Sequence, residues 1–200
     1  MLVRDWMRRH VITIESSQSL GDAHRLLVRH RIRQLPVMRD GRLVGIITHR
    51  DLRDARPLTR PVVSKMTAKP VTIGPDAAVD EAARRLRTYK IGGLPVVEHA
   101  RLLGIITVAD VLDGLIILTG VSEATYRLHL KDSGGRGMEA RARRAIERAR
   151  GEMRWLYRDA RLRRRELHMR VEVRGIERAV ALLKAEGFEL VRVVPPGRVP

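Results

Sequence analysis

The chain has 200 residues, of which 44% are hydrophobic, enough to bury the core of one large domain or two small ones. It contains no cysteine, which excludes a disulfide framework and thiolate chemistry, and it has no apolar run of the roughly 20 residues that span a membrane. Its net charge of +17 favours phosphate-bearing partners, from nucleotides to nucleic acid, and its first residues lack the apolar core of a secretory signal, so we expect a cytoplasmic protein with no membrane partner.

An internal repeat dominates the first half of the sequence. Residues 7–53 align without a gap with residues 66–112, at an offset of 59. The matching pieces include Met7 with Met66, the Leu-Pro-Val tripeptides, and the run Arg-Leu-x-Gly-Ile-Ile-Thr. An ungapped match of this length predicts a duplicated supersecondary unit.

Each copy is predicted to contain a strand, a helix, two further strands and a second helix. In the first copy, a strand at 12–14 precedes a helix that is capped by Ser19 and has apolar residues at helical spacing. Two β-rich runs then flank Asp40-Gly41, a strong hairpin signal, and the last helix begins after Thr48. The second copy repeats this order, with Asp76 as the predicted cap and His99-Ala100 as a weaker hairpin turn.

The pattern changes after the repeat, and the boundary is predicted near residues 114–125. Strand-like alternation and helical periodicity then follow in the order strand, helix, strand, strand, helix, strand. The predicted strands are 126–130, 153–157, 167–173 and 190–194. This order predicts a small sheet with two helices on one side.

The most informative motif is Gly-x-x-Thr-x-x-Asp, which begins at Gly45 and again at Gly104. Threonine followed by aspartate three residues later is the pattern of a helix capping box. The same arrangement suits a ligand, because a helix N-terminus with a hydroxyl can hold a phosphate, and a nearby carboxylate can accept hydrogen bonds from both hydroxyls of a ribose. The glycine is expected to let the backbone approach that ligand. Both interpretations can hold together.

These residues resemble the CBS domain, whose tandem pair binds adenosine-containing ligands in clefts between the two copies. The resemblance covers about residues 1–118 and rests on the leading methionine, the Leu-Pro-Val strand and the Thr-x-x-Asp motif, each present twice. It implies two nucleotide sites, in which phosphate and ribose are held by Thr48 with Asp51 and by Thr107 with Asp110. The residues implied as lining of the base pockets are Ile12, Thr13, Leu35 and Pro36 in the first copy, and Val71, Thr72, Leu94 and Pro95 in the second.

The two motifs differ in one charged residue. Arg50 adds a cation to the first motif, where the second has Ala109. Because a guanidinium strengthens a contact with phosphate, we expect the first site to hold charged phosphates more tightly. Arg33 and Arg101 are alternative cation donors for the second site.

The C-terminal part resembles an ACT domain, a βαββαβ regulatory fold that often binds amino acids in the loop after its first strand. Asp132, Gly134 and Gly135 form the corresponding loop here, with Gly134 in place of that family's proline; Gly135 alternatively only turns the chain. A CBS pair followed by an ACT-like domain is similar to the acetoin-utilisation AcuB group. The implied fold class is α+β, with CBS domains at 1–58 and 59–118, a linker at 119–125 and an ACT-like domain at 126–200.

We expect no catalytic residue, no metal site and no required cofactor. The histidines show no metal-ligand spacing such as His-x-x-x-His, and the Gly-x-Ser-x-Gly and Gly-Lys-Ser/Thr motifs are absent. The seven histidines are His10, His24, His30, His49, His99, His129 and His168.

The sequence therefore predicts a regulatory protein in which an adenine nucleotide or a related adenosyl ligand stabilises one arrangement of the CBS copies. We expect a homodimer, and an unidentified enzyme as a further partner. The apolar helical face expected to form the dimer contains Leu112, Leu115, Ile116 and Ile117. The alternative is a nucleic-acid-binding regulator that uses residues 141–165, where eleven arginines accompany three acids, although a solvated helix face and loop explain that run as well. Nucleic acid ranks second because the motif evidence is local and duplicated whereas the excess charge is spread over the chain. Aromatic residues, at 3%, are also too few for a base-stacking platform.

Overall fold

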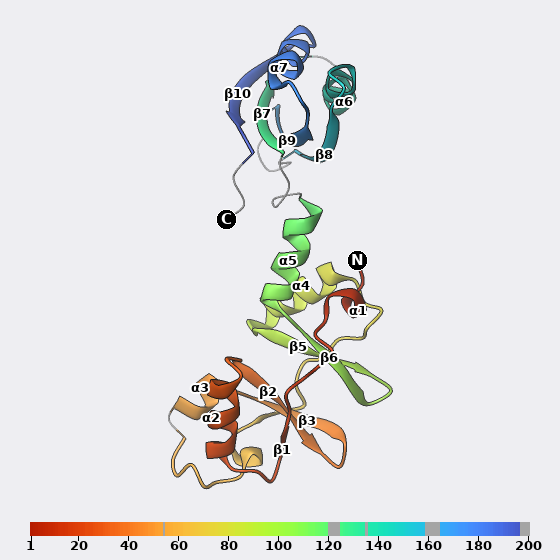
Figure 1. Cartoon of the computed structure of the whole chain (residues 1–200). Coiled ribbons are helices and arrows are strands. Elements are labelled where there is room, and N and C mark those ends of the chain that lie inside the picture. The colour runs from red at the N-terminus through yellow and green to blue at the C-terminus, as the bar shows by residue number, and fades with distance from the viewer. Residues whose placement is uncertain (54, 120–124, 135, 159–164, 197–200) are drawn as a thin grey trace. The chain divides into compact units, whose positions relative to one another are not determined.

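The structure is a computed structural model, and it describes residues 1–53, 55–119, 125–134, 136–158 and 165–196. The chain divides into two compact units, Met1–Gly114 and Leu115–Pro200. The first unit holds both copies of the repeat, and Figure 1 traces its elements from red to green. No helix in the described ranges is long and apolar enough to cross a membrane.

The first copy contains the predicted elements in the predicted order. They are β1 (Ile14–Glu15), α2 (Leu20–Arg29), β2 (Gln34–Arg39), β3 (Arg42–Thr48) and α3 (His49–Arg53). Strands β2 and β3 form an antiparallel hairpin, and β1 lies parallel to β2. Ser19 caps α2 as predicted: its hydroxyl accepts from the Asp22 amide, and the Asp22 carboxylate accepts from the Ser19 amide.

The second copy keeps the two helices and the hairpin of this arrangement. The strand predicted before its first helix is reduced to a single bridge between Ile73 and Val96. Its elements are α4 (Val79–Tyr89), β5 (Gly93–Glu98), β6 (Arg101–Thr107) and α5 (Val108–Leu118). The prediction that Asp76 caps its first helix is wrong, because the N-cap is Ala78 and Asp76 forms an ion pair with Arg4. The repeat offset explains the difference, since position 78, not 76, corresponds to Ser19.

Both hairpins turn through two left-handed residues. Asp40 and Gly41 have φ angles of 51° and 73°, while His99 and Ala100 have φ angles of 47° and 64°. Positive φ at both central positions matches the right-handed twist of the flanking strands. The second hairpin therefore keeps the turn of the first even though its sequence lacks the glycine that adopts this conformation most easily.

The two hydrophobic cores contain identical residues at equivalent positions of the repeat. Each core packs the face of one helix against alternate residues of a hairpin. The equivalent buried pairs are Ile14 and Ile73, Ala23 and Ala82, Leu27 and Leu86, Leu35 and Leu94, Val37 and Val96, and Ile47 and Ile106. Identical side-chain volumes at equivalent core positions confirm the duplicated unit that the alignment predicts.

The segments that precede the copies are exchanged between them. Arg8 pairs with Ile105 on β6 of the second copy, and α1 (Val3–Trp6) packs into the second core through Val3. The segment before the second copy runs instead to the first: β4 (Thr67–Ala68) pairs with β3, and the 3₁₀ turn Val62–Ser64 buries Val62 in the first core. Each copy is thus completed by the segment that precedes the other.

This exchange explains the repeated glycine and methionine. A Cβ at Gly45 would collide with the Met66 side chain, and a Cβ at Gly104 would collide with Met7 and the Arg8 carbonyl. Both glycines lie inside their strands, at positions where another segment crosses closely. They make room for the exchanged segment, so the expectation that they admit a ligand is replaced by a packing role.

The second unit folds as a four-stranded antiparallel sheet with two helices. Its elements are β7 (Tyr126–Asp132), α6 (Met138–Arg148), β8 (Glu152–Tyr157), β9 (Glu166–Glu172), α7 (Ile176–Ala185) and β10 (Phe188–Val194). The strand order is β10-β7-β9-β8. Alternate strand residues such as Leu128, Leu130 and Met169 pack against α6 and α7, and the other face of the sheet carries no helix among the described elements.

Candidate functional site

The two Thr-x-x-Asp motifs adopt the same geometry at the start of α3 and α5. In the first, the Thr48 amide and hydroxyl both donate to Oδ2 of Asp51, each at 2.7 Å, and the Asp51 amide lies 3.4 Å from the Thr48 hydroxyl. In the second, the corresponding distances for Thr107 and Asp110 are 2.8, 2.6 and 3.4 Å. The capping-box interpretation is therefore confirmed in both copies. In each motif Oδ2 is used by the cap, and Oδ1 is the oxygen that can accept from a ligand.

The two motifs lie close to the junction between the copies. Gln34 on β2 is the register partner of Thr48, and Gly93 on β5 is the register partner of Thr107. The Gln34 amide packs directly on Gly93, where an added Cβ would overlap its Nε2 atom. That buried Nε2 has no hydrogen-bond partner among the described residues. This buried nitrogen therefore lies where the register partners of the two threonines meet.

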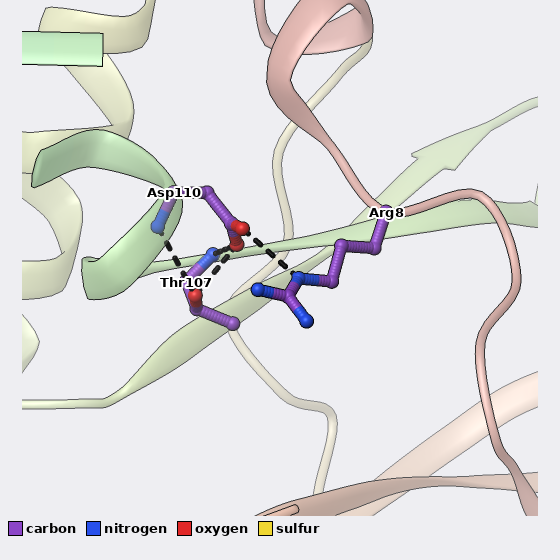
Figure 2. Close-up of polar contacts among 3 residues, drawn as sticks. All are labelled: Arg8, Thr107 and Asp110. Atoms are coloured by element: carbon purple, nitrogen blue, oxygen red, sulfur yellow. Dashed lines mark hydrogen bonds and ion pairs between the residues drawn. The ribbon is translucent and has the colours of Figure 1, made fainter. Parts of the chain in front are cut away.

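The environments of the two carboxylates differ. Arg8 donates from Nε to Oδ1 of Asp110 at 3.0 Å, so both oxygens of that carboxylate are occupied (Figure 2). The Asp110 side chain is 7% exposed, whereas the Arg8 side chain is 66% exposed and can leave for solvent. Position 67, the equivalent of Arg8, is Thr67, so the first motif has no such arginine.

The three arginines that the sequence suggests as phosphate contacts are all exposed. Arg50 is exposed on α3 and makes no hydrogen bond or ion pair with any described residue, which leaves its guanidinium available. Arg33 and Arg101 are exposed, and neither is the cation that contacts the second motif. Sequence reasoning missed Arg8 because it lies outside the motif and reaches the second copy only through the segment exchange. The Met7–Met66 match marks these segments as equivalent, but it does not say which copy each one joins.

The predicted base-pocket residues divide into two groups. Leu35 and Leu94 are fully buried in the two cores, so their side chains support the hairpins rather than line a cleft. Pro36 and Pro95 are buried beside these leucines on β2 and β5. The remaining predicted residues are partly exposed and lie outside the strands; they are Ile12, Thr13, Val71 and Thr72.

The carbonyl of Thr72 is already used in the second copy. It accepts a hydrogen bond from Arg85, which also pairs with Glu81 on the same helix. The equivalent of Arg85 in the first copy is Leu26, which cannot donate. In two places, therefore, groups that a nucleotide could contact are occupied by arginine in the second copy and not in the first.

Two surface pockets of the first unit lie away from the motifs. One of about 500 Å³ runs along α2, and another of about 370 Å³ lies beside His24 and His49. Neither is lined by a threonine or aspartate of the motifs, so neither is assigned to a nucleotide.

The predicted amino-acid loop is built around a buried ion pair. Asp132 Oδ1 accepts from Arg141 at 2.5 Å, and the Gly134 amide lies 3.3 Å from the same oxygen. The Asp132 side chain is 1% exposed, so an amino acid could reach it only by displacing Arg141. Gly135 lies outside the described residues.

Comparison with known proteins addresses the first unit. The CBS domain model matches residues 3–57 and 62–117, which together form more than half of the chain. The chain belongs to the CBS domain family. Its duplicated unit is a CBS pair, and the α+β fold with tandem CBS copies predicted from the sequence is confirmed.

Curated relatives share the CBS pair within longer proteins. An inosine-5′-monophosphate dehydrogenase of Korarchaeum cryptofilum is 41% identical over 104 residues, which cover 52% of this chain and 22% of the dehydrogenase. An L-aspartate semialdehyde sulfurtransferase of Methanocaldococcus jannaschii is 35% identical over 113 residues, covering 55% of this chain and 22% of that enzyme. The chain thus spans less than a quarter of these relatives.

Solved CBS pairs are similar in structure and include ligand complexes. The CBS pair of protein MJ0100, in complex with 5′-methylthioadenosine and S-adenosyl-L-methionine, matches with a TM-score of 0.54 and 34% identity, over 57% of this chain and 95% of that one. CBSX2 of Arabidopsis thaliana in complex with AMP gives 0.55 and 29%, over 58% and 96%. A Vibrio cholerae protein described as an acetoin utilization protein (AcuB) gives 0.56 and 32%, over 62% and 96%.

Proposed function

We propose that this protein is a regulatory sensor whose CBS pair binds adenosine-containing ligands at the junction between its copies. The observation that carries the proposal is the pair of Thr-x-x-Asp motifs, which have the same hydrogen-bond geometry and lie next to the same junction. Similar CBS pairs have been solved with AMP and with adenosyl ligands, which supports the same ligand class here.

At the first site, Asp51 Oδ1 is the proposed acceptor for the ribose hydroxyls. Thr48 fixes that carboxylate through Oδ2, so the acceptor is already oriented before the ligand arrives. Phosphate would lie at the start of α3, where Arg50 supplies a guanidinium. Pro36 on β2 and Thr13, directly before β1, are proposed to flank the base.

At the second site, a ligand must first displace Arg8 from Asp110. A ribose then replaces the guanidinium on Oδ1, and a phosphate offers Arg8 a new partner. Because the Arg8–Asp110 pair is broken on binding, we propose that the second site is weaker than the first for every adenosine ligand. This adds a second cause to the inequality that Arg50 predicts.

Ligand binding would act by stabilising one arrangement of the two CBS copies, which is a shift in population rather than chemistry.

We further propose that the second unit is an ACT-like domain, because its element order is the βαββαβ order of that fold, and that the protein belongs with the AcuB group. The proposed assembly is a homodimer that acts on an enzyme target, and nucleic acid is the alternative partner.

The experiment is calorimetry with AMP, ADP, ATP, S-adenosylmethionine and NAD on the full chain. We expect at least one of these to bind, with Asp51→Asn and Asp110→Asn each removing one binding event. Asp80→Asn, an exposed residue of α4 outside the motifs, is the matched control and should change nothing. A ligand at about 100 times its Kd would also stabilise the fold by about 2.7 kcal/mol, visible as a higher Tm.

Two results would contradict the proposal. One is a failure of all five ligands to bind; the other is binding that survives both motif substitutions. If single-stranded or duplex nucleic acid binds instead, with an affinity that persists at physiological salt, the basic surface is the functional one.

A further inference from the structure

A cluster of metal-ligand side chains lies on the face of the second unit's sheet that α6 and α7 leave uncovered. His129 on β7 and His168 on β9 are direct register partners, and Glu166 is two residues from His168 on the same strand. Successive strand residues point to opposite faces, so all three share the face opposite the core residues Leu130 and Leu167. Their juxtaposition comes from strand pairing, which explains why no linear spacing reveals it.

The geometry of the cluster is close to that of a three-ligand metal centre. His129 Nε2 lies 3.2 Å from Glu166 Oε2, and one ligand atom from each of the three residues lies within 4.8 Å of the other two. Ligands around a tetrahedral zinc ion, at 2.0–2.1 Å from it, are separated by about 3.4 Å. A shared ion would therefore require the side chains to rotate so that these separations shorten and the two ring nitrogens converge.

The rings are held in place by their neighbours. The His129 and His168 rings stack with centroids 4.2 Å apart and an interplanar angle of 17°. Tyr157 on β8 lies 6.4 Å from His168, and Trp155 stacks on Tyr157 at 5.7 Å. The side chains of His129 and Glu166 are only 25% and 16% exposed. Binding one ion would turn the two rings out of this parallel stack, because ring nitrogens donate in the plane of the ring and must converge on the ion.

The cluster opens into a pocket of about 590 Å³, which leaves room for a fourth ligand. Arg127, Arg170 and Arg192 line the same pocket. Their charges oppose a bare dication. Arg127 and Arg192 are exposed and screened by solvent, Arg170 is 8% exposed and donates to the Thr125 hydroxyl, and the Glu166 carboxylate is in the cluster itself. The same arginines favour an anionic group in the open coordination position.

We propose that His129, Glu166 and His168 bind one divalent transition-metal ion of the zinc type, with the fourth position facing the pocket. Two imidazoles and a carboxylate are a donor set that suits Zn²⁺, Co²⁺ and Ni²⁺, and they do not suit Ca²⁺ or Mg²⁺, which take oxygen ligands. Three protein ligands with one open position form a site that can exchange a water for a small anion. This site is independent of the nucleotide sites of the CBS pair.

The test is titration of the metal-free full chain with Zn²⁺ by calorimetry and with Co²⁺ by visible absorption. We expect one equivalent to bind, and the bound Co²⁺ to show the strong d–d bands of a four-coordinate ion. His129→Ala, His168→Ala and Glu166→Gln should each weaken binding at least tenfold. Glu166→Gln keeps the shape and an acceptor oxygen of the glutamate, so it reports on the carboxylate even if a histidine variant fails to fold.

The matched control is His24→Ala with His49→Ala. These two rings also meet edge to face, 6.3 Å apart, but they lie in the CBS pair and have no carboxylate in the cluster. The control should bind Zn²⁺ like the parent. The proposal is overturned if the parent binds no ion at 0.1 mM Co²⁺, if the bands are those of a six-coordinate ion, or if only the control loses binding.

Discussion

At the scale of single residues, the aspartate of each motif has two separate tasks. One carboxylate oxygen closes the capping box with threonine, and the other takes no part in the cap. In the first copy this second oxygen is open to a ligand, whereas in the second copy Arg8 occupies it. The two CBS copies share a fold and a motif. They differ before a ligand arrives, because the carboxylate of the second motif is already paired with an arginine and that of the first is not.

Replacing Arg8 should therefore change the second site in a ligand-dependent way. In an Asp51→Asn background, which leaves only the second site, Arg8→Ala frees Asp110 and should strengthen adenosine binding. AMP should gain less or lose affinity, because its phosphate no longer meets a guanidinium. We expect the preference for AMP over adenosine to fall about tenfold, the value of one charge-assisted contact of roughly 1.5 kcal/mol, as measured by calorimetry.

Arg9→Ala is the control for this measurement. Arg9 is the neighbouring exposed arginine, and its side chain donates to the Arg4 carbonyl and to no other residue in the described part of the chain, so its loss should leave both affinities unchanged. Equal affinities for adenosine before and after Arg8→Ala would show that the Arg8–Asp110 pair does not oppose the ligand.

At the scale of elements, the helices α2 and α4 form a natural comparison. They occupy equivalent positions, but α2 has a complete capping box and α4 begins at Ala78 with no side-chain cap. The pKa of Asp22 is lowered, first by the hydrogen bond from the Ser19 hydroxyl, then by the Ser19 amide, and further by Arg25. Glu81 in α4 stands where Asp22 stands in α2 and pairs with Arg85, so α4 has the acidic residue of a capping box but not the capping hydroxyl.

Adding that hydroxyl should stabilise the second copy. Ala78→Ser creates a Ser-x-x-Glu capping box, and we expect it to raise the free energy of unfolding by about 0.5–2 kcal/mol at pH 7. Ser19→Ala should lower it by a similar amount. Urea unfolding followed by circular dichroism measures both, and a loss of stability in Ala78→Ser would contradict the expected cap.

The Ser19→Ala effect should also depend on pH. A carboxyl group whose pKa is lowered by folding contributes stability that is complete above its unfolded pKa, here the ordinary value of 3.8. That contribution is lost as the pH falls through the lowered value. The difference between the parent and Ser19→Ala should therefore shrink in acid, whereas a pH-independent difference would mean that the Asp22 carboxylate has no part in the cap.

The sequence predicts the elements well because local signals and the repeat agree. Ser19 and Asp40-Gly41 specify a cap and a turn by their own chemistry, and the repeat carries the core positions to the second copy. Asp76 has the side chain of a good capping residue, but the register of the repeat places the N-cap at Ala78. Residue type and register therefore point to different positions there, and the register is correct. The segment exchange could not be predicted, since a strand that pairs with either of two equivalent hairpins buries similar surface.

The site residues can likewise be predicted where they form a local pattern and cannot where they depend on long-range strand pairing. The residues Thr48 and Asp51 are found from their spacing, because a capping box is a local pattern. Arg8 and the His129–Glu166–His168 cluster are not local: each depends on which strands pair, and strand register is decided by the whole buried face.

At the scale of the whole molecule, helix α5 exposes a run of apolar side chains. Apolar side chains of α5 are 40–62% exposed, and these residues are Val108, Leu112, Leu115, Ile116, Ile117 and Leu118. A run of exposed apolar residues on one helix is typical of an interface. The proposed homodimer would bury this surface against a second copy of the chain.

Light scattering tests this proposal directly. At micromolar concentration the parent should have about twice the chain mass of 22.7 kDa, and Leu112→Asp with Ile116→Asp should reduce it to one chain mass. Val28→Asp, an equally exposed apolar position on α2, should leave the mass unchanged. If the two α5 substitutions lower the Tm of a parent that is already monomeric, the helix is covered within its own chain and the dimer is excluded.

The exchange of segments also sets the order in which the chain can fold during synthesis. Thr67 follows its partner Ile46 by 21 residues, so the first copy receives its extra strand soon after its hairpin is made. Arg8 precedes its partner Ile105 by 97 residues, so the segment that closes the second copy is made long before the strand with which it pairs. Until then Val3 and Trp6 have no core to enter, because their neighbours in the second copy have not yet been translated. The segment with Val3, Trp6 and Arg8 is thus synthesised early but packs late. In the interval between, its apolar side chains are exposed to chaperones and to other chains.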